Sequence, residues 1–184
     1  MRFASHGHVD SALLFSIEEH AINLARQSGT MLLGLFGQKL DIDYKSKGNS
    51  DPVTGADLQA QEFLIKGIRS KFPCHGILSE EMSEPHGLDH DFLWVIDPLD
   101  GTVNFINGYP MFGISIGVLH KGMPVVGVLF IPSPGVAGGQ VFHAKLNGGA
   151  FVDGAPIRVY SGTDIDSKGL VSMPAQFPGH FRAG

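Results

Sequence analysis

The sequence has little of several features that mark specialised classes of protein. It contains one cysteine, Cys74, among 184 residues. An intrachain disulfide framework is therefore excluded, and a reducing compartment is favoured. No uninterrupted apolar run approaches the roughly 18 residues of a membrane-spanning helix, and the N-terminus has no hydrophobic stretch of the signal-peptide type. These absences predict a cytoplasmic protein that has no membrane partner.

Basic residues are also scarce. The 13 Lys and Arg residues and 18 Asp and Glu residues give a net charge of −5. A nucleic-acid binder needs clustered positive charge to neutralise phosphates, so we expect no nucleic-acid partner. The composition, 43% hydrophobic and 17% charged, is typical of a folded globular protein. The length suits one domain with a sizeable core.

Helical periodicity predicts two helices in the N-terminal part of the chain. From Asp10 onward, apolar residues recur at helical spacing, which predicts a helix that ends near Gly34 or Gly37. A second amphipathic pattern follows Thr54, which can cap it. Asp57 would lie in the first turn of this helix, where an acidic side chain often serves the helix dipole alone.

The following part of the chain has the pattern of strands separated by Gly, Pro and Asn-Gly turn signals. The segments "HKGMP" and "LNGG" are typical of hairpin connections, so the sheet should be largely antiparallel. Helices followed by strands indicate an α+β fold, with two N-terminal helices packed on one face of the sheet. The expected strands are residues 76–81, 92–97, 113–120, 124–132, 139–145 and 149–159.

The stretch "WVIDPLDGTVNF", residues 94–105, joins an apolar strand directly to two acidic residues. Asp97 and Asp100 are three positions apart, so in a straight strand they would point to opposite faces. Pro98 favours ending the strand after Asp97 and turning the chain. In such a turn both carboxylates can converge with the carbonyl of Leu99. Mg²⁺ prefers these oxygen ligands, so we expect a metal site here.

Other groups would complete a site for a phosphate ester. Gly101 permits a close backbone approach, and the amides of Gly101 and Thr102 could donate to a phosphate. Glu80 and Glu81 end the preceding strand pattern, and one of them would lie beside Asp97 if the two strands are neighbours. Crowded carboxylates raise one another's pKa values, which favours bound cations. The alternative is a solvated acidic loop, because most Asp-Gly pairs simply form turns.

On these residues the chain resembles the inositol monophosphatase family. Residues 97–105 match the family's D-P-[IL]-D-G-T-x-N-F motif, and Glu80 and Glu81 match its G-E-E segment. Residues 47–57 match its K-x-x-x-D-x-V-T-x-A-D segment, and the later "AKLNGGAFVDGAPIRV" is similar to a family hairpin. The resemblance extends from about Leu13 through nearly the entire chain.

The resemblance implies a Mg²⁺-dependent, lithium-sensitive phosphatase with two or three metal sites. Its substrate would be inositol monophosphate or a similar sugar phosphate, hydrolysed by in-line attack of a metal-activated water, and a homodimer is also implied. The residues assigned by the resemblance are Glu80, Asp97, the Leu99 carbonyl and Asp100 as metal ligands, Glu80, Thr102 and Asp57 in catalysis, Gly101 and Thr102 for the substrate phosphate, and Glu81 and Lys47 in supporting roles.

Members of this family run well past 184 residues and carry a further metal-binding aspartate in a C-terminal W-D-x-A-A segment. The sequence has one tryptophan, Trp94, and no such segment. The resemblance therefore implies that the chain covers roughly the N-terminal two thirds of the family's length, that the C-terminal domain is missing and that activity is impaired. The expected organisation is a disordered N-terminus at 1–9, a metal-binding α+β phosphatase domain at 10–165, and the start of a truncated C-terminal domain at 166–184.

Three alternatives stay open. Two belong to the same superfamily: a fructose-1,6-bisphosphatase and a 3′-phosphonucleotide phosphatase. Asn104 and Phe105 favour the inositol or fructose branch over the nucleotide branch. The third is a non-catalytic metal-binding module that keeps the fold without turnover. A haloacid dehalogenase type of phosphatase is disfavoured, because its second aspartate stands two residues after the first, where this chain has Leu99.

Overall fold

The computed structural model describes residues 9–39, 42–44, 52–82, 88–133, 135–136 and 138–159. The predictions for residues 1–8, for 160–184 and for Lys47 lie outside this part of the chain, so the proposed division at residue 165 stays a prediction. Within the described residues, no helix is both long and apolar enough to cross a membrane.

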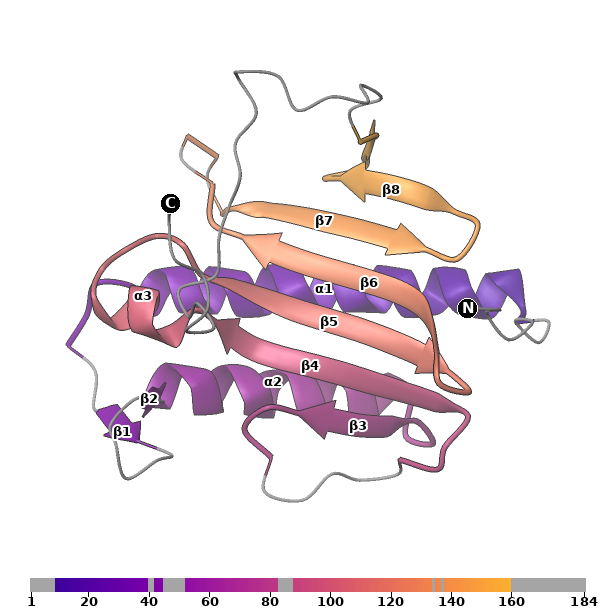
Figure 1. The fold of residues 1–184 in the computed structure, drawn as a ribbon, viewed down its shortest axis with the longest axis horizontal. Coiled ribbons are helices and arrows are strands. Elements are labelled where there is room, and N and C mark those ends of the chain that lie inside the picture. The colour runs from indigo at the N-terminus through magenta and orange to yellow at the C-terminus, as the bar shows by residue number, and fades with distance from the viewer. Residues whose placement is uncertain are drawn as a thin grey trace, which may run out of the picture.

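A seven-stranded sheet forms the centre of the fold (Figure 1). Its strands, in their order across the sheet, are β3 (Gly76–Ser79), β4 (Phe92–Asp100), β5 (Gly113–His120), β6 (Met123–Ile131), β7 (Gln140–Lys145), β8 (Gly149–Val152) and β9 (Ala155–Ile157). The β3–β4 pair is parallel and every other pair in this sheet is antiparallel. The prediction of a largely antiparallel sheet is confirmed.

Two long helices, α1 (Ser11–Leu35) and α2 (Gly55–Lys71), lie on the same face of this sheet (Figure 1). The Asp10 carboxylate caps α1 by accepting from the amide of Ala12 at 3.0 Å. The helix ends at Leu35, close to the predicted end. The α+β class, with two N-terminal helices packed on the sheet, is therefore confirmed.

The core lies between the helices and the sheet. Apolar side chains that recur along one side of each helix meet the alternating inward positions of the central strands, as the periods of helices and strands require. The large side chains that are completely or almost completely buried include Ile17, Leu32, Leu64, Ile68, Trp94, Ile116, Val128 and Phe130.

The structure divides or adds secondary-structure elements in three places. The expected strand at 149–159 is two strands, β8 and β9, because Asp153 and Gly154 adopt positive φ angles and turn the chain. A short antiparallel pair, β1 (Ile42–Tyr44) and β2 (Pro52–Thr54), was not predicted. The five-residue helix α3 (Thr102–Ile106) was also missed, because a single turn is too short to show helical periodicity.

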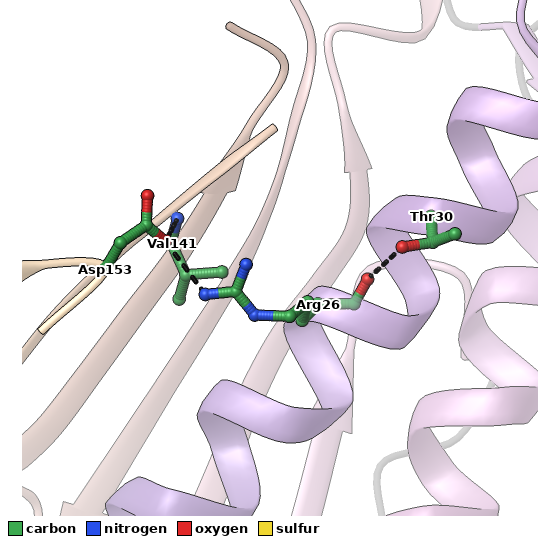
Figure 2. Close-up of polar contacts among 4 residues, drawn as sticks. All are labelled: Arg26, Thr30, Val141 and Asp153. Atoms are coloured by element: carbon green, nitrogen blue, oxygen red, sulfur yellow. Dashed lines mark hydrogen bonds and ion pairs between the residues drawn. The ribbon is translucent and has the colours of Figure 1, made fainter. Parts of the chain in front are cut away.

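A polar contact ties α1 to the turn between β8 and β9 (Figure 2). The guanidinium of Arg26 donates to Asp153 Oδ1 at 2.8 Å, and the same oxygen accepts from the amide of Val141 at 3.1 Å. The turn is therefore attached both to a neighbouring strand and to the helix layer. The Thr30 hydroxyl donates to the Arg26 carbonyl at 2.9 Å within α1.

Candidate active site

The strand β4 carries an irregularity at the predicted metal corner. Asp97 lies opposite Ser115 of β5, and Asp100 lies opposite Gly113, so three steps on β4 match two steps on β5. Because Ser115 and Gly113 are two positions apart, they share a face, and their partners Asp97 and Asp100 share it too. The extra residue in β4 therefore brings both acidic positions to one side of the sheet.

The prediction that Pro98 ends the strand after Asp97 was wrong. β4 continues to Asp100. Proline lacks an amide hydrogen, and the structure places it within the irregularity between Asp97 and Asp100, where a ladder hydrogen bond is not required. The two acidic residues are brought together by a bulge in place of the expected turn.

The parallel pairing of β3 with β4 places the glutamates as the sequence suggested. Ser79 is the register partner of Ile96, and the next amide, of Glu80, donates to the Ile96 carbonyl at 3.2 Å. Glu80 therefore follows β3 at the level of Asp97, and the two carboxyl groups are hydrogen-bonded. The prediction that one glutamate lies beside Asp97 is confirmed.

Electrostatic crowding is strongest at Asp97. Burial, followed by the negative charges of Glu80 and Asp100, raises the pKa of Asp97 to about 7. The Leu99 amide donates to Asp97 Oδ1 at 3.1 Å, which favours the carboxylate and opposes this shift only in part. A half-buried acid in this setting is stabilised as a carboxylate by a nearby positive charge.

Asp57 joins the start of α2 to the start of α3. Its Oδ2 accepts from the Thr54 amide at 2.8 Å and from the Thr54 hydroxyl at 2.5 Å. Its Oδ1 accepts from the Thr102 hydroxyl at 3.0 Å, and this hydroxyl also lies 3.1 Å from the Leu99 carbonyl oxygen. Asp57 is almost completely buried. Asp57 therefore completes the capping box at the start of α2, and it also contacts the site, so its role is not confined to the helix.

Gly101 sits between β4 and α3 with a φ of +87°, in the left-handed region that favours glycine. A Cβ atom at this position would lie 2.8 Å from the carbonyl oxygen of Met111. The Asn104 side chain donates to that same carbonyl at 2.6 Å. Glycine is therefore required here by the backbone angle and by the close approach of the following loop.

Gln61 is a residue of the site that the sequence reading missed. Its side-chain oxygen accepts from the Ser79 hydroxyl at 2.5 Å, and its amide donates to the Glu81 carbonyl at 3.3 Å. Gln61 lies one helical turn after Asp57 in α2, so both face the acidic corner. A polar residue one turn after a buried acid was the signal that could have identified it. Gln61 orients the segment that carries both glutamates.

The chemistry of the donor set fits Mg²⁺, which prefers carboxylate and carbonyl oxygens. Three carboxyl groups, those of Glu80, Asp97 and Asp100, interact at this corner. Among the residues that the structure describes, no group of three or more Asp, Glu, His or Cys side chains is placed so that it could hold a metal ion. The metal-ligand assignments from the sequence therefore stay proposals that rest on donor chemistry and on the crowding of acids.

The packing of helices on a largely antiparallel sheet matches about half of each of several solved inositol monophosphatase structures. The chain belongs to the inositol monophosphatase family, whose family model matches residues 14–176. An IMPase from Thermotoga maritima superposes with a TM-score of 0.70 at 34% identity, over 79% of this chain and 54% of that one. The recognition of the family from sequence is confirmed.

Relatives with different names show comparable similarity. A histidinol-phosphatase of Chlorobaculum parvum is 37% identical over 76% of this chain and 51% of its own length. The Nus factor SuhB of Escherichia coli K12 is 36% identical over 83% of this chain and 55% of its own length. The chain thus spans about half the length of the curated relatives that it matches, which is less than the roughly two thirds expected from the sequence.

Proposed function

We propose that this protein is a Mg²⁺-dependent phosphatase that hydrolyses inositol monophosphate or a similar small sugar phosphate. The observation that carries the proposal is the acidic corner. Two acidic positions share one side of β4, Glu80 at the end of β3 joins them, and Asp97 has a pKa raised to about 7. Membership of the inositol monophosphatase family supports the same reading.

In this proposal the metal ligands are Glu80, Asp97, the Leu99 carbonyl and Asp100. When bound, Mg²⁺ would lower the pKa of a water and stabilise charge on the leaving oxygen. The amides of Gly101 and Thr102 would bind the phosphate. Supporting roles fall to Glu81 and to Lys47, of which the latter lies outside the described residues.

Thr102 is proposed to orient the attacking water together with Glu80. Its hydroxyl proton is directed toward Asp57 Oδ1 or the Leu99 carbonyl, at 3.0 and 3.1 Å. A hydroxyl has one proton and two lone pairs, so the Thr102 oxygen remains able to accept a hydrogen bond from a water. Asp57, fixed by Thr54, would keep the hydroxyl in this orientation. The water oxygen would form a bond to phosphorus as the bond from phosphorus to the ester oxygen breaks, and the alcohol would leave with a proton taken from the water.

Other substrates than inositol monophosphate are also candidates. The relatives include a histidinol-phosphatase, so histidinol phosphate is a second candidate. Fructose 1,6-bisphosphate and 3′-phosphonucleotides stay open within the superfamily, as does a non-catalytic metal-binding module. Relatives named Nus factor SuhB also match, so a role other than hydrolysis of a phosphate ester is a further candidate. Asn104 and Phe105 favour the inositol or fructose branch.

The experiment measures Mg²⁺ binding by calorimetry and phosphate release from each candidate substrate, for the wild type, Asp97→Asn and a control, Asp89→Asn. Asp89 is exposed and lies at the far end of β4 from the site. We expect Asp97→Asn to lose both properties and Asp89→Asn to keep them. Metal binding without release of phosphate from any substrate would favour the non-catalytic module. No metal binding by the wild type would contradict the proposal.

A further inference from the structure

The two glutamates of the site lie in a tight turn that directly follows β3. The Met82 amide donates to the Ser79 carbonyl at 3.2 Å, so Glu80 and Glu81 occupy the two central positions of a β-turn. The Glu80 amide donates to the Ile96 carbonyl at 3.2 Å and continues the register of β3 with β4. The direction of the Glu80 carboxyl group therefore depends on the conformation of this turn.

The Gln61 side chain connects this turn to α2. Its Oε1 accepts from the Ser79 hydroxyl at 2.5 Å, and its Nε2 donates to the Glu81 carbonyl at 3.3 Å. One amide group thus holds the first and third residues of the turn. A backbone carbonyl can only accept, so the NH2 group must face Glu81, and the amide oxygen is left for Ser79. Neither a carboxylate nor an alkyl side chain of the same length could form both bonds.

Hydrogen bonds are the means by which this turn is held, because burial does little for it. Glu80 is exposed, so apolar packing does not restrain the residue that carries the carboxyl group. Ser79 is only 3% exposed, and the loss of the acceptor on Gln61 would leave its buried hydroxyl without this bond, which is costly. The contact between Ser79 and Gln61 therefore anchors an exposed turn to the protein interior.

The helix α2 also positions the opposite side of the corner. Asp57 lies one turn before Gln61, and its Oδ1 accepts from the Thr102 hydroxyl at 3.0 Å. The start of the helix is fixed by the capping box of Thr54 and Asp57. α2 therefore contacts both groups that are proposed to orient the attacking water, which are Thr102 and the turn of Glu80. A rigid element between two such groups fixes their separation.

We propose that Gln61 and Ser79 are positioning residues of the metal site. By fixing the turn, they hold the Glu80 carboxyl group beside Asp97 and thereby strengthen the binding of Mg²⁺. Groups that orient a metal ligand without touching the metal commonly change metal affinity by roughly 10–100-fold when they are removed. This inference rests on the proposed phosphatase function and adds to its metal site two residues that the ligand set does not include.

The test measures the dissociation constant of Mg²⁺ by calorimetry for Gln61→Met and Ser79→Ala. Methionine has nearly the length of glutamine and forms neither hydrogen bond. We expect each substitution to weaken Mg²⁺ binding about 10-fold. The double variant should bind less than about 3-fold more weakly than the weaker single variant, because the two changes share one hydrogen bond. Gln59→Met makes the same chemical change at an exposed position of α2 and should keep the wild-type affinity.

Two further measurements separate positioning from a general loss of stability. Glu18 contacts β7 and lies outside the site, so Glu18→Gln should destabilise the fold and keep the affinity for Mg²⁺. In metal-free protein, hydrogen exchange followed by NMR reports on the turn itself. Gln61→Met should accelerate exchange of the Glu80 and Met82 amides by a larger factor than exchange of the Ala21 amide, in the middle of α1.

Three results would overturn the inference. If the wild type binds Mg²⁺ and both single variants bind it equally well, the turn needs no such support, and the phosphatase proposal stands. If Glu18→Gln weakens Mg²⁺ binding as much as Gln61→Met does, the affinity follows global stability, and the inference fails alone. If a folded wild-type protein binds no Mg²⁺, the phosphatase proposal and the inference fail together. Ser79→Ala removes a single oxygen atom and gives the decisive comparison if Gln61→Met does not fold.

Discussion

The Thr102 hydroxyl donates to Asp57 Oδ1 at 3.0 Å, across 45 positions of the sequence. This bond connects the first turns of α2 and α3 and places a threonine and an aspartate at the edge of the acidic corner. The near-complete burial of Asp57 makes the contact important to both stability and the site, because a buried carboxylate oxygen without a donor is costly.

Thr102→Val should therefore destabilise the protein by about 1–3 kcal/mol, since it keeps the shape of the side chain and removes the donor to Asp57. Urea unfolding followed by circular dichroism measures the change. Thr102→Ser keeps the hydroxyl and should stay within about 1 kcal/mol of the wild type. Equal losses for valine and serine would show that the contact with Asp57 contributes nothing.

Gly101→Ala should lower the free energy of unfolding by more than an alanine substitution at another glycine of positive φ. The new Cβ would lie 2.8 Å from the Met111 carbonyl oxygen, in addition to the strain of a φ of +87°. Gly108 has a φ of +71° and nothing within 4 Å of its Cβ direction, so Gly108→Ala carries the backbone strain alone. We expect roughly 1–2 kcal/mol for Gly108→Ala.

The free energies of unfolding of these two variants test the steric argument. Gly101→Ala should lose at least about 1 kcal/mol more than Gly108→Ala, since a displaced loop is added to the same strain. If the two variants lose equal stability, the close approach of Met111 has no energetic consequence.

Glu18 of α1 is a buried acid that contacts β7. Its carboxylate accepts from His143 Nδ1 at 2.9 Å and from the Lys145 ammonium group. Burial alone would raise the pKa of Glu18, but the hydrogen bonds and positive charges of Lys145 and His143 outweigh it, so the pKa is lowered. A lowered pKa means that the ionised Glu18 stabilises the fold. This stabilisation is present above the ordinary pKa of glutamate and is lost as the pH falls through the lowered pKa.

Glu18→Gln should thus reduce stability at pH 7 by about 1–3 kcal/mol and flatten the loss of stability in acid. The measurement is the free energy of unfolding between pH 3 and 7. Glu19→Gln removes an exposed acid one position away and should change little. If Glu18→Gln loses stability in acid as steeply as the wild type does, the loss does not arise from Glu18.

His75 lies in an aromatic stack between Phe72 and Phe92, with ring centroids 4.8 Å away on each side. Its Nδ1 accepts from Trp94 Nε1 at 3.0 Å, which requires the neutral ring. Burial, and after it the charge of His90, lowers the pKa of His75. Stability is therefore complete above the unfolded pKa of about 6.5 and declines as the pH falls through the interval below it.

The substitution His75→Asn keeps an acceptor near the Nδ1 position and removes the titrating ring. It should reduce the slope of stability against pH below about 6.5, where one histidine contributes at most about 1.4 kcal/mol per pH unit. Thermal unfolding at half-unit pH steps measures this slope. His90→Asn should keep most of the wild-type slope of stability against pH. His20 Nε2 donates to the Gly67 carbonyl at 2.9 Å. Burial lowers the pKa of His20, so His20 will contribute the remaining slope.

The sequence by itself determined the features that depend on neighbouring residues. Helical spacing located α1 and α2, Thr54 marked a cap, and turn signals located the β5–β6 and β7–β8 hairpins. The acidic motif at 97–105 identified the corner and the family. These inferences succeed because periodicity, capping and turn conformation are set by interactions over a few residues.

Only the tertiary structure decided how the corner is assembled. A bulge, in place of the turn expected from Pro98, sets Asp97 and Asp100 on one side of β4, because the extra residue is defined by pairing with β5. The contacts of Asp57 with Thr102 and of Gln61 with Ser79 cross 45 and 18 positions. Such contacts depend on strand register and helix packing, which are fixed by the burial of the whole core and by no local pattern.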